Sequence, residues 1–142
     1  MKVMLIGKAT KETEAGQMPT EEAMVAMHNY TEALQKAGVL VDLAGLTPTS
    51  RGARVRYRGN KCRVIDGPFA ESKEVIAGYF MIEVKTLAEA IDWAKRAPFG
   101  LGVNDGEEAE VEIRPLFDPT EFDVPGEAEE RAKRLAEKAG EA

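Results

Sequence analysis

The residues best suited to chemistry gather near the middle of the chain, in the stretch Asp66-Gly67-Pro68-Phe69-Ala70-Glu71-Ser72-Lys73-Glu74. A carboxylate that lies beside a lysine can have its pKa adjusted for general-base catalysis, although exposed ion pairs are the commoner arrangement. The aromatic ring in this stretch would point into the core or into a pocket. We therefore predict a small-molecule cleft whose wall includes Asp66, Phe69, Glu71 and Lys73.

The same stretch also has a purely conformational interpretation. Asp side chains bond to the nearby backbone, Gly permits positive φ and Pro fixes the following φ, so Asp66-Gly67-Pro68 indicates a turn. The charged residues Glu71, Lys73 and Glu74 would then form ion pairs locally or between two copies of the chain. The residues alone leave both interpretations open.

Arginines that alternate with apolar residues predict a β-hairpin just before this stretch. The runs 53–57 and 61–65 flank the turn Arg58-Gly59-Asn60, and their period of two is that of half-buried strands. The arginines would share one local sheet, either as a solvated strand face or as an anion site. We include Arg56 in the wall of the cleft. The arginines of the hairpin are Arg54, Arg56, Arg58 and Arg63.

Cys62 is the single cysteine, so no disulfide can form within the chain. Its neighbours Lys61 and Arg63 could make an exposed thiol more reactive, but an ordinary strand residue is the simpler interpretation. The sequence has no CxxC or Cys/His signature, and we predict neither a metal site nor a cofactor.

Composition narrows the class of protein. A chain of 142 residues with 44% apolar residues is expected to form about one domain. The net charge of −6 argues against a nucleic-acid partner. No apolar run reaches the length of a membrane span, and the first residues do not resemble a signal peptide. We expect a cytoplasmic protein without a membrane partner.

The elements that must position these residues follow from periodicity and capping signals. Thr20 and Gly38 are predicted to cap the ends of a first helix, and Thr86 begins a second helix that ends before Pro98. Apolar residues at helical spacing predict that Met24, among others, belongs to the buried stripe of the first helix. The segment 8–17 is predicted as a loop. Strands are predicted over 3–6, 39–46, 75–84 and 109–117.

The order strand–helix–strand, hairpin, strand–helix–strand predicts an α+β chain with the ferredoxin-like split βαβ fold and an inserted hairpin. Both helices would cover one face of a four-stranded sheet. Since the strands carry apolar residues on both faces, we predict that a second copy covers the other face in a homodimer. The domain is expected to span residues 1–123, followed by a charged, helical tail at 124–142.

The central nonapeptide resembles the defining motif of the DGPFAETKE family, within the wider YCII-related superfamily, with Ser72 where Thr is usual. Other segments are similar to landmarks of that family, and the resemblance covers roughly residues 1–123. These segments are Ala37-Gly38-Val39-Leu40, Ala77-Gly78-Tyr79-Phe80, Ala90-Ile91-Asp92-Trp93-Ala94 and Glu112-Ile113-Arg114-Pro115.

The resemblance implies a ferredoxin-like fold that pairs into a dimeric α/β barrel. It also implies a cleft with a catalytic His–Asp pair in some members of the superfamily. The single histidine, His28, lies on the first predicted helix, with Asp66 or Asp42 as its partner. A solvated or core histidine is the simpler interpretation. If His28 acts, the chemistry would be proton abstraction or elimination on a small polar substrate.

Two classes of function follow. The first is a small-molecule-binding homodimer with lyase- or isomerase-like activity. The second is a non-enzymatic interaction protein linked to extracytoplasmic-function sigma factors, a context that the resemblance implies, with residues 126–142 making the contact.

Overall fold

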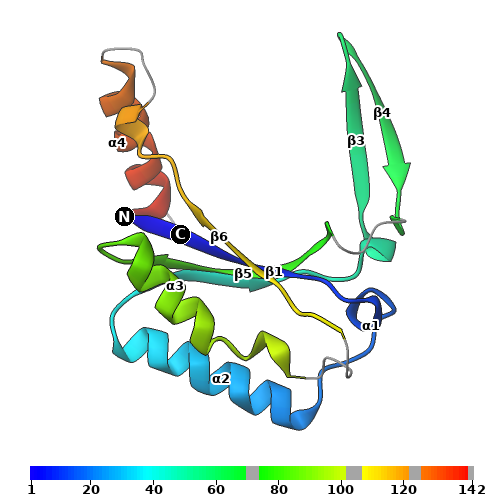
Figure 1. Ribbon diagram of the computed structural model, residues 1–142. Helices are drawn as coiled ribbons and strands as arrows, with labels where there is room; N and C mark the ends of the chain where they lie inside the picture. The colour runs from blue at the N-terminus through cyan, green and yellow to red at the C-terminus, as the bar shows by residue number, and fades with distance from the viewer. Residues whose placement is uncertain (70–73, 102–106, 122–125, 141–142) are drawn as a thin grey trace.

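The computed structural model describes residues 1–69, 74–101, 107–121 and 126–140 (Figure 1). Glu71 and Lys73 therefore lie outside the described residues. The strands are β1 (Lys2–Lys8), β2 (Leu40–Gly45), β3 (Ala53–Arg58), β4 (Lys61–Asp66), β5 (Ile76–Glu83) and β6 (Val111–Pro115). The helices are α1 (Lys11–Glu14), α2 (Glu21–Lys36), α3 (Leu87–Arg96) and α4 (Glu127–Gly140), with short 3₁₀ turns at Thr49–Arg51, Pro98–Gly100 and Pro119–Glu121.

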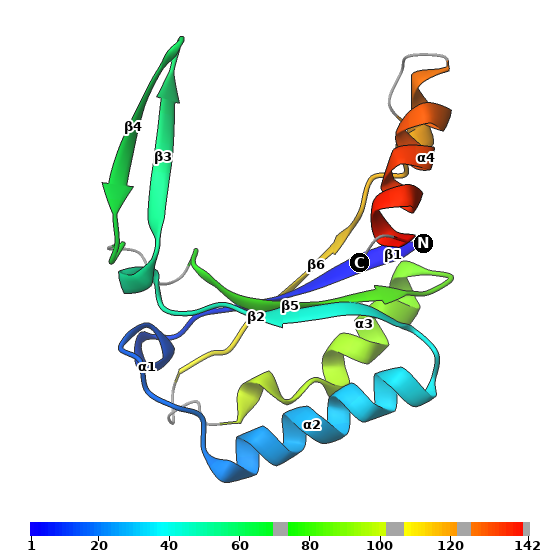
Figure 2. The same cartoon turned by 180° about the vertical axis from the view of Figure 1, so that it is seen from behind.

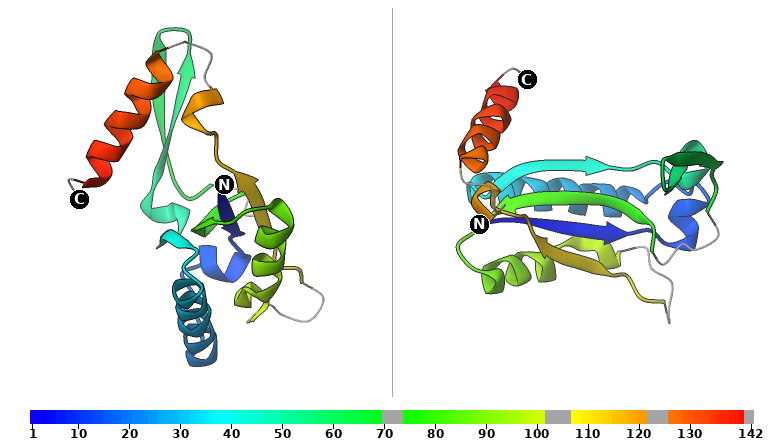
Figure 3. Two further views of the ribbon diagram at one scale, coloured as in Figure 1. Left: turned by 90° about the vertical axis from the view of Figure 1, so that its left-hand side faces the viewer. Right: turned by 90° about the horizontal axis from the view of Figure 1, so that it is seen from above.

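Four strands form one antiparallel sheet in the order β2-β5-β1-β6, which can be followed in the view from above (Figure 3). This order agrees with the predicted ferredoxin-like α+β arrangement. The remaining strands, β3 and β4, form a separate two-stranded sheet, which confirms the predicted hairpin. The prediction that these strands are half-buried is wrong, because the hairpin projects from the body of the chain and nearly all of its strand residues are exposed. Within the described ranges the four-stranded sheet stays open, with β2 and β6 at its edges.

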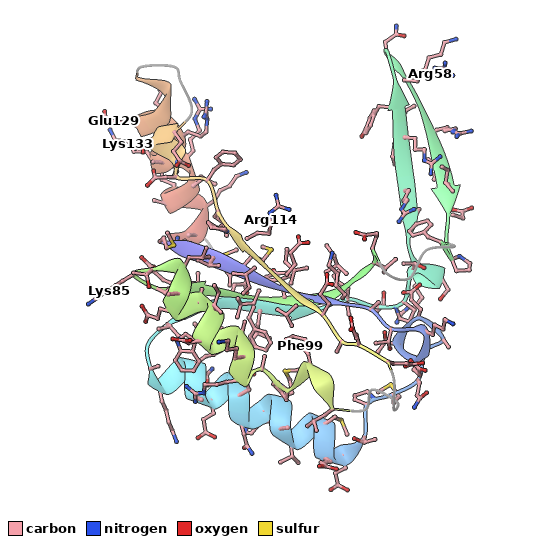
Figure 4. The ribbon with its side chains drawn as sticks, viewed as in Figure 1. Arg58, Lys85, Phe99, Arg114, Glu129 and Lys133 are labelled. Carbon is pink, nitrogen blue, oxygen red and sulfur yellow. The ribbon has the colours of Figure 1, made fainter. Side chains whose placement is uncertain are left out.

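One face of the sheet packs against α2 and α3, and the core lies between these layers (Figure 1). Cross-strand neighbours place Leu5 opposite Phe80 and Ile113 on this face, because residues directly opposite each other share one face of a sheet. Phe99 also packs here, and Figure 4 shows its ring beneath the sheet. The buried core consists of Val3, Leu5, Tyr30, Leu34, Phe80, Ile82, Val84 and Ala90.

Tyr30 joins the two helices inside this core. Its hydroxyl donates a 2.7 Å hydrogen bond to the carbonyl oxygen of Trp93. Its ring meets Phe80 edge-on, with 5.3 Å between ring centroids. Burial raises the pKa of the Tyr30 phenol to about 12, while the positive charge of Arg96 acts weakly in the opposite direction.

The predicted caps of α2 are confirmed, and two other predictions are wrong. The Thr20 hydroxyl accepts from the Ala23 N–H at 3.1 Å, and Gly38 adopts a φ of 71° after the helix. Met24 is 50% exposed and lies outside the buried stripe, because the core covers a narrower face of the helix than its apolar spacing predicts. The predicted loop 8–17 contains the one-turn helix α1, which Thr10 caps at its first residue.

Two elements rise from the sheet on the side opposite α2 and α3. The β3–β4 hairpin, residues 53–66, stands at one end of the sheet, and we call it the arm. Helix α4 stands at the other end, so the arm and α4 flank the uncovered face of the sheet (Figures 1 and 2). None of the helices in the described part of the chain is long and apolar enough to cross a membrane.

Candidate functional site

The sheet face turned away from α2 and α3, here called the open face, has an apolar centre. Met4 lies opposite Met81, and Ile6 lies opposite Tyr79, on the two central strands β1 and β5. Met4, Tyr79 and Met81 are only partly buried. A sheet face with apolar side chains that its own chain leaves partly exposed is typical of a surface that another molecule covers.

A carboxylate and a phenol meet at the β2 side of this centre. Asp42 lies opposite Met81, and the Tyr79 hydroxyl donates a 3.0 Å hydrogen bond to its Oδ2. The other oxygen, Oδ1, accepts from the Leu43 N–H at 2.9 Å and fixes the orientation of the carboxylate. The hydrogen bond to Asp42, followed by the carboxylate's charge, raises the pKa of Tyr79 above its ordinary value. Tyr79 is therefore a protonated donor beside an anchored carboxylate.

Charged side chains occupy the β6 side of the open face. Lys8 Nζ lies 3.6 Å from Glu112 Oε1 and 3.9 Å from Glu74 Oε2, and the Lys8 side chain is only 12% exposed. Glu112 Oε2 also accepts a hydrogen bond from Arg114 Nη1 at 3.4 Å. Figure 4 shows the Arg114 side chain above the sheet, on the side of the open face. The open face thus has an apolar centre between two polar margins of different chemistry.

The first residues of the central motif fix the base of the arm. The Thr49 hydroxyl donates a 2.6 Å hydrogen bond to Glu14 Oε2 and accepts from the Phe69 N–H at 3.1 Å. The Gly67 N–H donates to the Gly52 carbonyl oxygen at 3.0 Å. A Cβ on Gly67 would overlap the carbonyl oxygen of Thr49, so only glycine allows this approach. These contacts give Gly67 and Phe69 a conformational role.

The predicted cleft wall is only partly assembled among the described residues. Phe69 lies beneath the guanidinium of Arg54, with 3.8 Å from Cζ to the ring centroid. Arg56 lies further along the arm, where it is exposed and opposite Arg63. Asp66 ends β4 opposite Ala53 and is also exposed.

The structure does not bring His28 and Asp66 together. His28 is exposed on α2, beneath the covered face of the sheet, whereas Asp66 belongs to the arm on the opposite side (Figure 1). Asp42 also projects from the open face, since it shares that face with Met81. A catalytic role for His28 and Asp66 stays a prediction.

A concave region lies at the edge of the sheet, between α3 and β6, and its lining shares no residue with the polar pair on the open face. It has a volume of about 430 Å³ and opens widely to solvent. Its lining is mainly apolar, with Lys95 and Glu107 as charged members. No group of three or more His, Cys, Asp or Glu side chains that could hold a metal ion occurs within the described ranges.

Sequence reasoning assigned no role to Tyr79, Lys8 or Glu14. Asp42 was considered only as a partner of His28, and Glu112 and Arg114 only as part of a segment similar to a family landmark. The sequence signal for these residues is the alternation of side chains between the two faces of a strand. In the first strand, this alternation indicates that Lys8 shares a face with Met4 and Ile6. Which residues meet across the strands depends on register, which the alternation alone does not determine.

Comparisons with known proteins identify the family. The sequence profile of the YCII-related domain matches residues 1–117. An uncharacterised protein of Rhizobium meliloti is 37% identical over 81 residues, which are 57% of this chain and 62% of that protein, so the match spans less than two thirds of the relative's length.

Among solved structures, 5-chloro-2-hydroxyhydroquinone dehydrochlorinase from Burkholderia phenoliruptrix, in complex with 2,5-dihydroxybenzoquinone, is similar with a TM-score of 0.48 and 12% identity. That similarity covers 87% of this chain and 100% of the other. The family match alone covers well over half of the residues, and the chain therefore belongs to the YCII-related family.

Proposed function

We propose that the chain is a small-molecule-binding homodimer with lyase- or isomerase-like activity, and that the site lies on the open face. One observation carries this proposal: the anchored Asp42–Tyr79 pair borders an apolar sheet face that α2 and α3 do not cover and on which Met4 and Met81 stay partly exposed. Within the family, we infer the DGPFAETKE subgroup from the nonapeptide that begins at Asp66.

The proposed dimer forms when two open faces stack on each other. Met4 and Met81, which are partly exposed in one chain, would then lose their contact with water, whereas Ile6 is already buried. Burial of apolar surface contributes roughly 25 cal/mol per Å². Two such sheets together would form a dimeric α/β barrel. The polar margins would remain at the rim of the interface, where a small molecule can enter between the sheets.

The chemistry proposed for this site is proton transfer. Asp42 is the candidate proton acceptor, because its carboxylate is oriented by the Leu43 N–H. Tyr79 would donate a hydrogen bond to an oxygen of the substrate, in place of the one it now gives to Asp42. Lys8 and Arg114 on the β6 side are each paired with Glu112, so this margin would offer hydrogen-bond donors and acceptors to a polar substrate rather than a net positive charge.

A thermal-shift screen of small polar metabolites, followed by calorimetric titration of each hit, tests this site. We expect Asp42→Asn and Tyr79→Phe each to weaken binding about tenfold, the effect of losing roughly one hydrogen bond to an ionised or substrate group. Asp92→Asn, the same change on the exposed surface of α3, is the matched control and should bind normally. Unchanged affinity in both open-face variants would place the ligand elsewhere.

The predicted pair His28 and Asp66 is the competing catalytic assignment. His28→Ala and Asp66→Ala are assayed for turnover of the same hits, with light scattering to show that assembly is unchanged. Loss of turnover in these variants, with normal rates in Asp42→Asn, would favour that pair. Wild-type rates in both His28→Ala and Asp66→Ala would rule out this pair as the catalytic residues.

The alternative function is a non-enzymatic interaction through the tail. Leu135 on α4 is 56% exposed, and α4 stands clear of the two helices that cover the sheet (Figure 2). We propose 1–123 as the domain, with the tail at 124–142 as a separable contact element. If the tail makes this contact, deleting residues 126–142 should abolish capture of a sigma factor or its regulator in a pull-down. Capture of the same partner by the truncated chain would count against it.

A further inference from the structure

The arm has two chemically distinct faces. Strand pairing places Arg56 opposite Arg63 and Arg58 opposite Lys61, so these side chains share one face. The other face carries the intervening residues. We call them the basic face and the apolar face of the arm. The apolar face consists of Val55 opposite Val64 and Tyr57 opposite Cys62, with Ala53 opposite Asp66 at its base.

The apolar face of the arm lies in contact with solvent. Val55 is 46% exposed, Val64 is 65% exposed and Tyr57 is 80% exposed. A two-stranded hairpin is at best marginally stable in water unless another element covers one of its faces. Figures 1 and 2 show β3 and β4 projecting away from the four-stranded sheet and both of its helices. The fold of one chain therefore provides no cover for this face among the described residues.

The basic face of the arm is also without a partner in its own chain. No carboxylate forms an ion pair with Arg56, Arg58, Lys61 or Arg63 among the residues that the structure describes. Like charges that lie directly opposite on two strands destabilise the pairing. Figure 4 shows Arg58 at the tip of the arm, away from the four-stranded sheet. The cluster would be stabilised by an external negative charge.

The charge of the rest of the chain indicates which molecule supplies the negative charge that the basic face of the arm needs. Residues 53–66 carry five bases and one acid, a net charge of +4. The other residues carry 14 bases and 24 acids, a net charge of −10. The arm and the body of this protein are therefore strongly complementary, yet the arm projects away from its own body. A second copy of the chain offers the acidic surface that the arm lacks.

The base of the arm holds it in this position. Glu14 binds Thr49, Thr49 binds the Phe69 N–H, and Gly67 fits against the Thr49 carbonyl. Arg54, the arginine nearest the base, stacks on Phe69 and connects the arm to this network. An arm that is already oriented loses less conformational entropy when it binds than a flexible loop would.

We propose that the arm of each protomer docks on a second copy of the chain. Its apolar face is buried against that copy, and its basic face pairs with that copy's carboxylates. The inference rests on the homodimer of the proposed function and adds to it: each open-face site is flanked by an arm from the partner. In a two-fold dimer both arms make the same contact.

The native cysteine provides the test, because Cys62 lies on the apolar face and is the only cysteine. The reaction rate of its thiol with Ellman's reagent is measured in the folded protein and divided by the rate in guanidinium chloride. The reference is Cys62→Ser combined with Ser50→Cys, which places the thiol on the exposed 3₁₀ turn. Light scattering on the same samples gives the oligomeric state.

We expect a dimer in which Cys62 reacts at least about tenfold more slowly than the reference thiol, since a tenfold difference corresponds to about 1.4 kcal/mol of protection. Val55→Ser with Val64→Ser should restore fast reaction. Arg56→Glu with Arg63→Glu should raise the dissociation constant of the dimer by about tenfold or more. Lys85→Glu with Lys95→Glu makes the same change in net charge outside the arm and should have little effect.

The possible failures are distinguishable. A dimer in which Cys62 reacts as fast as the reference thiol overturns the docking of the arm and leaves the homodimer intact. A wild-type protein that is monomeric overturns both. Equal effects of the two charge-reversal pairs overturn the pairing of the basic face with a second copy.

Discussion

Gly67→Ala tests whether the motif acts through conformation at the base of the arm. An added Cβ would overlap the Thr49 carbonyl oxygen, lie 2.6 Å from the Thr49 carbonyl carbon and lie 3.3 Å from the Gly52 oxygen. All three are backbone atoms, so no side chain can rotate away. The two backbone segments must move apart.

The expected loss has two parts. Forcing an extra methyl group into a packed site destabilises it by about 1–3 kcal/mol. The shift also breaks the hydrogen bond from the Gly67 N–H to Gly52, which contributes about 1 kcal/mol. The total of about 2–4 kcal/mol falls on the arm rather than on the four-stranded sheet, because the two sheets are separate.

Amide hydrogen exchange measures this loss locally. Amides of the β3–β4 ladder, and the Phe69 N–H, should exchange about 30- to 700-fold faster in Gly67→Ala, or become unprotected, whereas those of β1 and β5 should be unchanged. Gly45→Ala is the control, because its added Cβ meets no atom within 4 Å. Protection of the arm that stays within about threefold of wild type would refute a conformational role for Gly67.

Two further changes test the core and the open face. Tyr30→Phe should lower the free energy of unfolding by about 1 kcal/mol at neutral pH, since it removes the hydrogen bond to Trp93. The raised pKa of Tyr30 stabilises the fold below pH 10, and this stability is lost as the pH rises towards about 12. Between pH 10 and about pH 12, the free energy of unfolding from urea titrations should therefore fall by about 2–3 kcal/mol less in Tyr30→Phe than in the wild type. An equal fall in the two proteins would contradict the assignment. Glu112→Gln should destabilise by about 0.5–1 kcal/mol at low salt, and less at high salt, because Lys8 loses its nearest carboxylate. Glu108→Gln serves as the control, and an equal effect in both would argue against the Lys8 ion pair.

Local signals predicted much of the fold. Thr20 and Gly38 act within one turn of the helix that they cap, and Gly59-Asn60 forms the turn of the arm without help from distant residues. The order of helices and strands then limits the sheet to few arrangements, and the observed β2-β5-β1-β6 order agrees with the split βαβ prediction.

The candidate site was less accessible to sequence reasoning because it depends on contacts between distant segments. Asp42 and Tyr79 are 37 residues apart, and a shift of one residue in either strand would turn one of them to the covered face. Glu14 and Thr49 are 35 residues apart, and neither belongs to a pattern that indicates their contact. The family resemblance made His28 a candidate, and helix periodicity alone does not place it near a sheet carboxylate.

The mass of the protein in solution tests the central claim, that the open faces of two chains meet. Multi-angle light scattering is applied to the wild type, to Met81→Asp on the open face and to Val25→Asp on the exposed surface of α2. We expect twice the chain mass of 15.5 kDa for the wild type and Val25→Asp, and 15.5 kDa for Met81→Asp. A wild type of 15.5 kDa, or a Met81→Asp variant that remains dimeric, would contradict this claim.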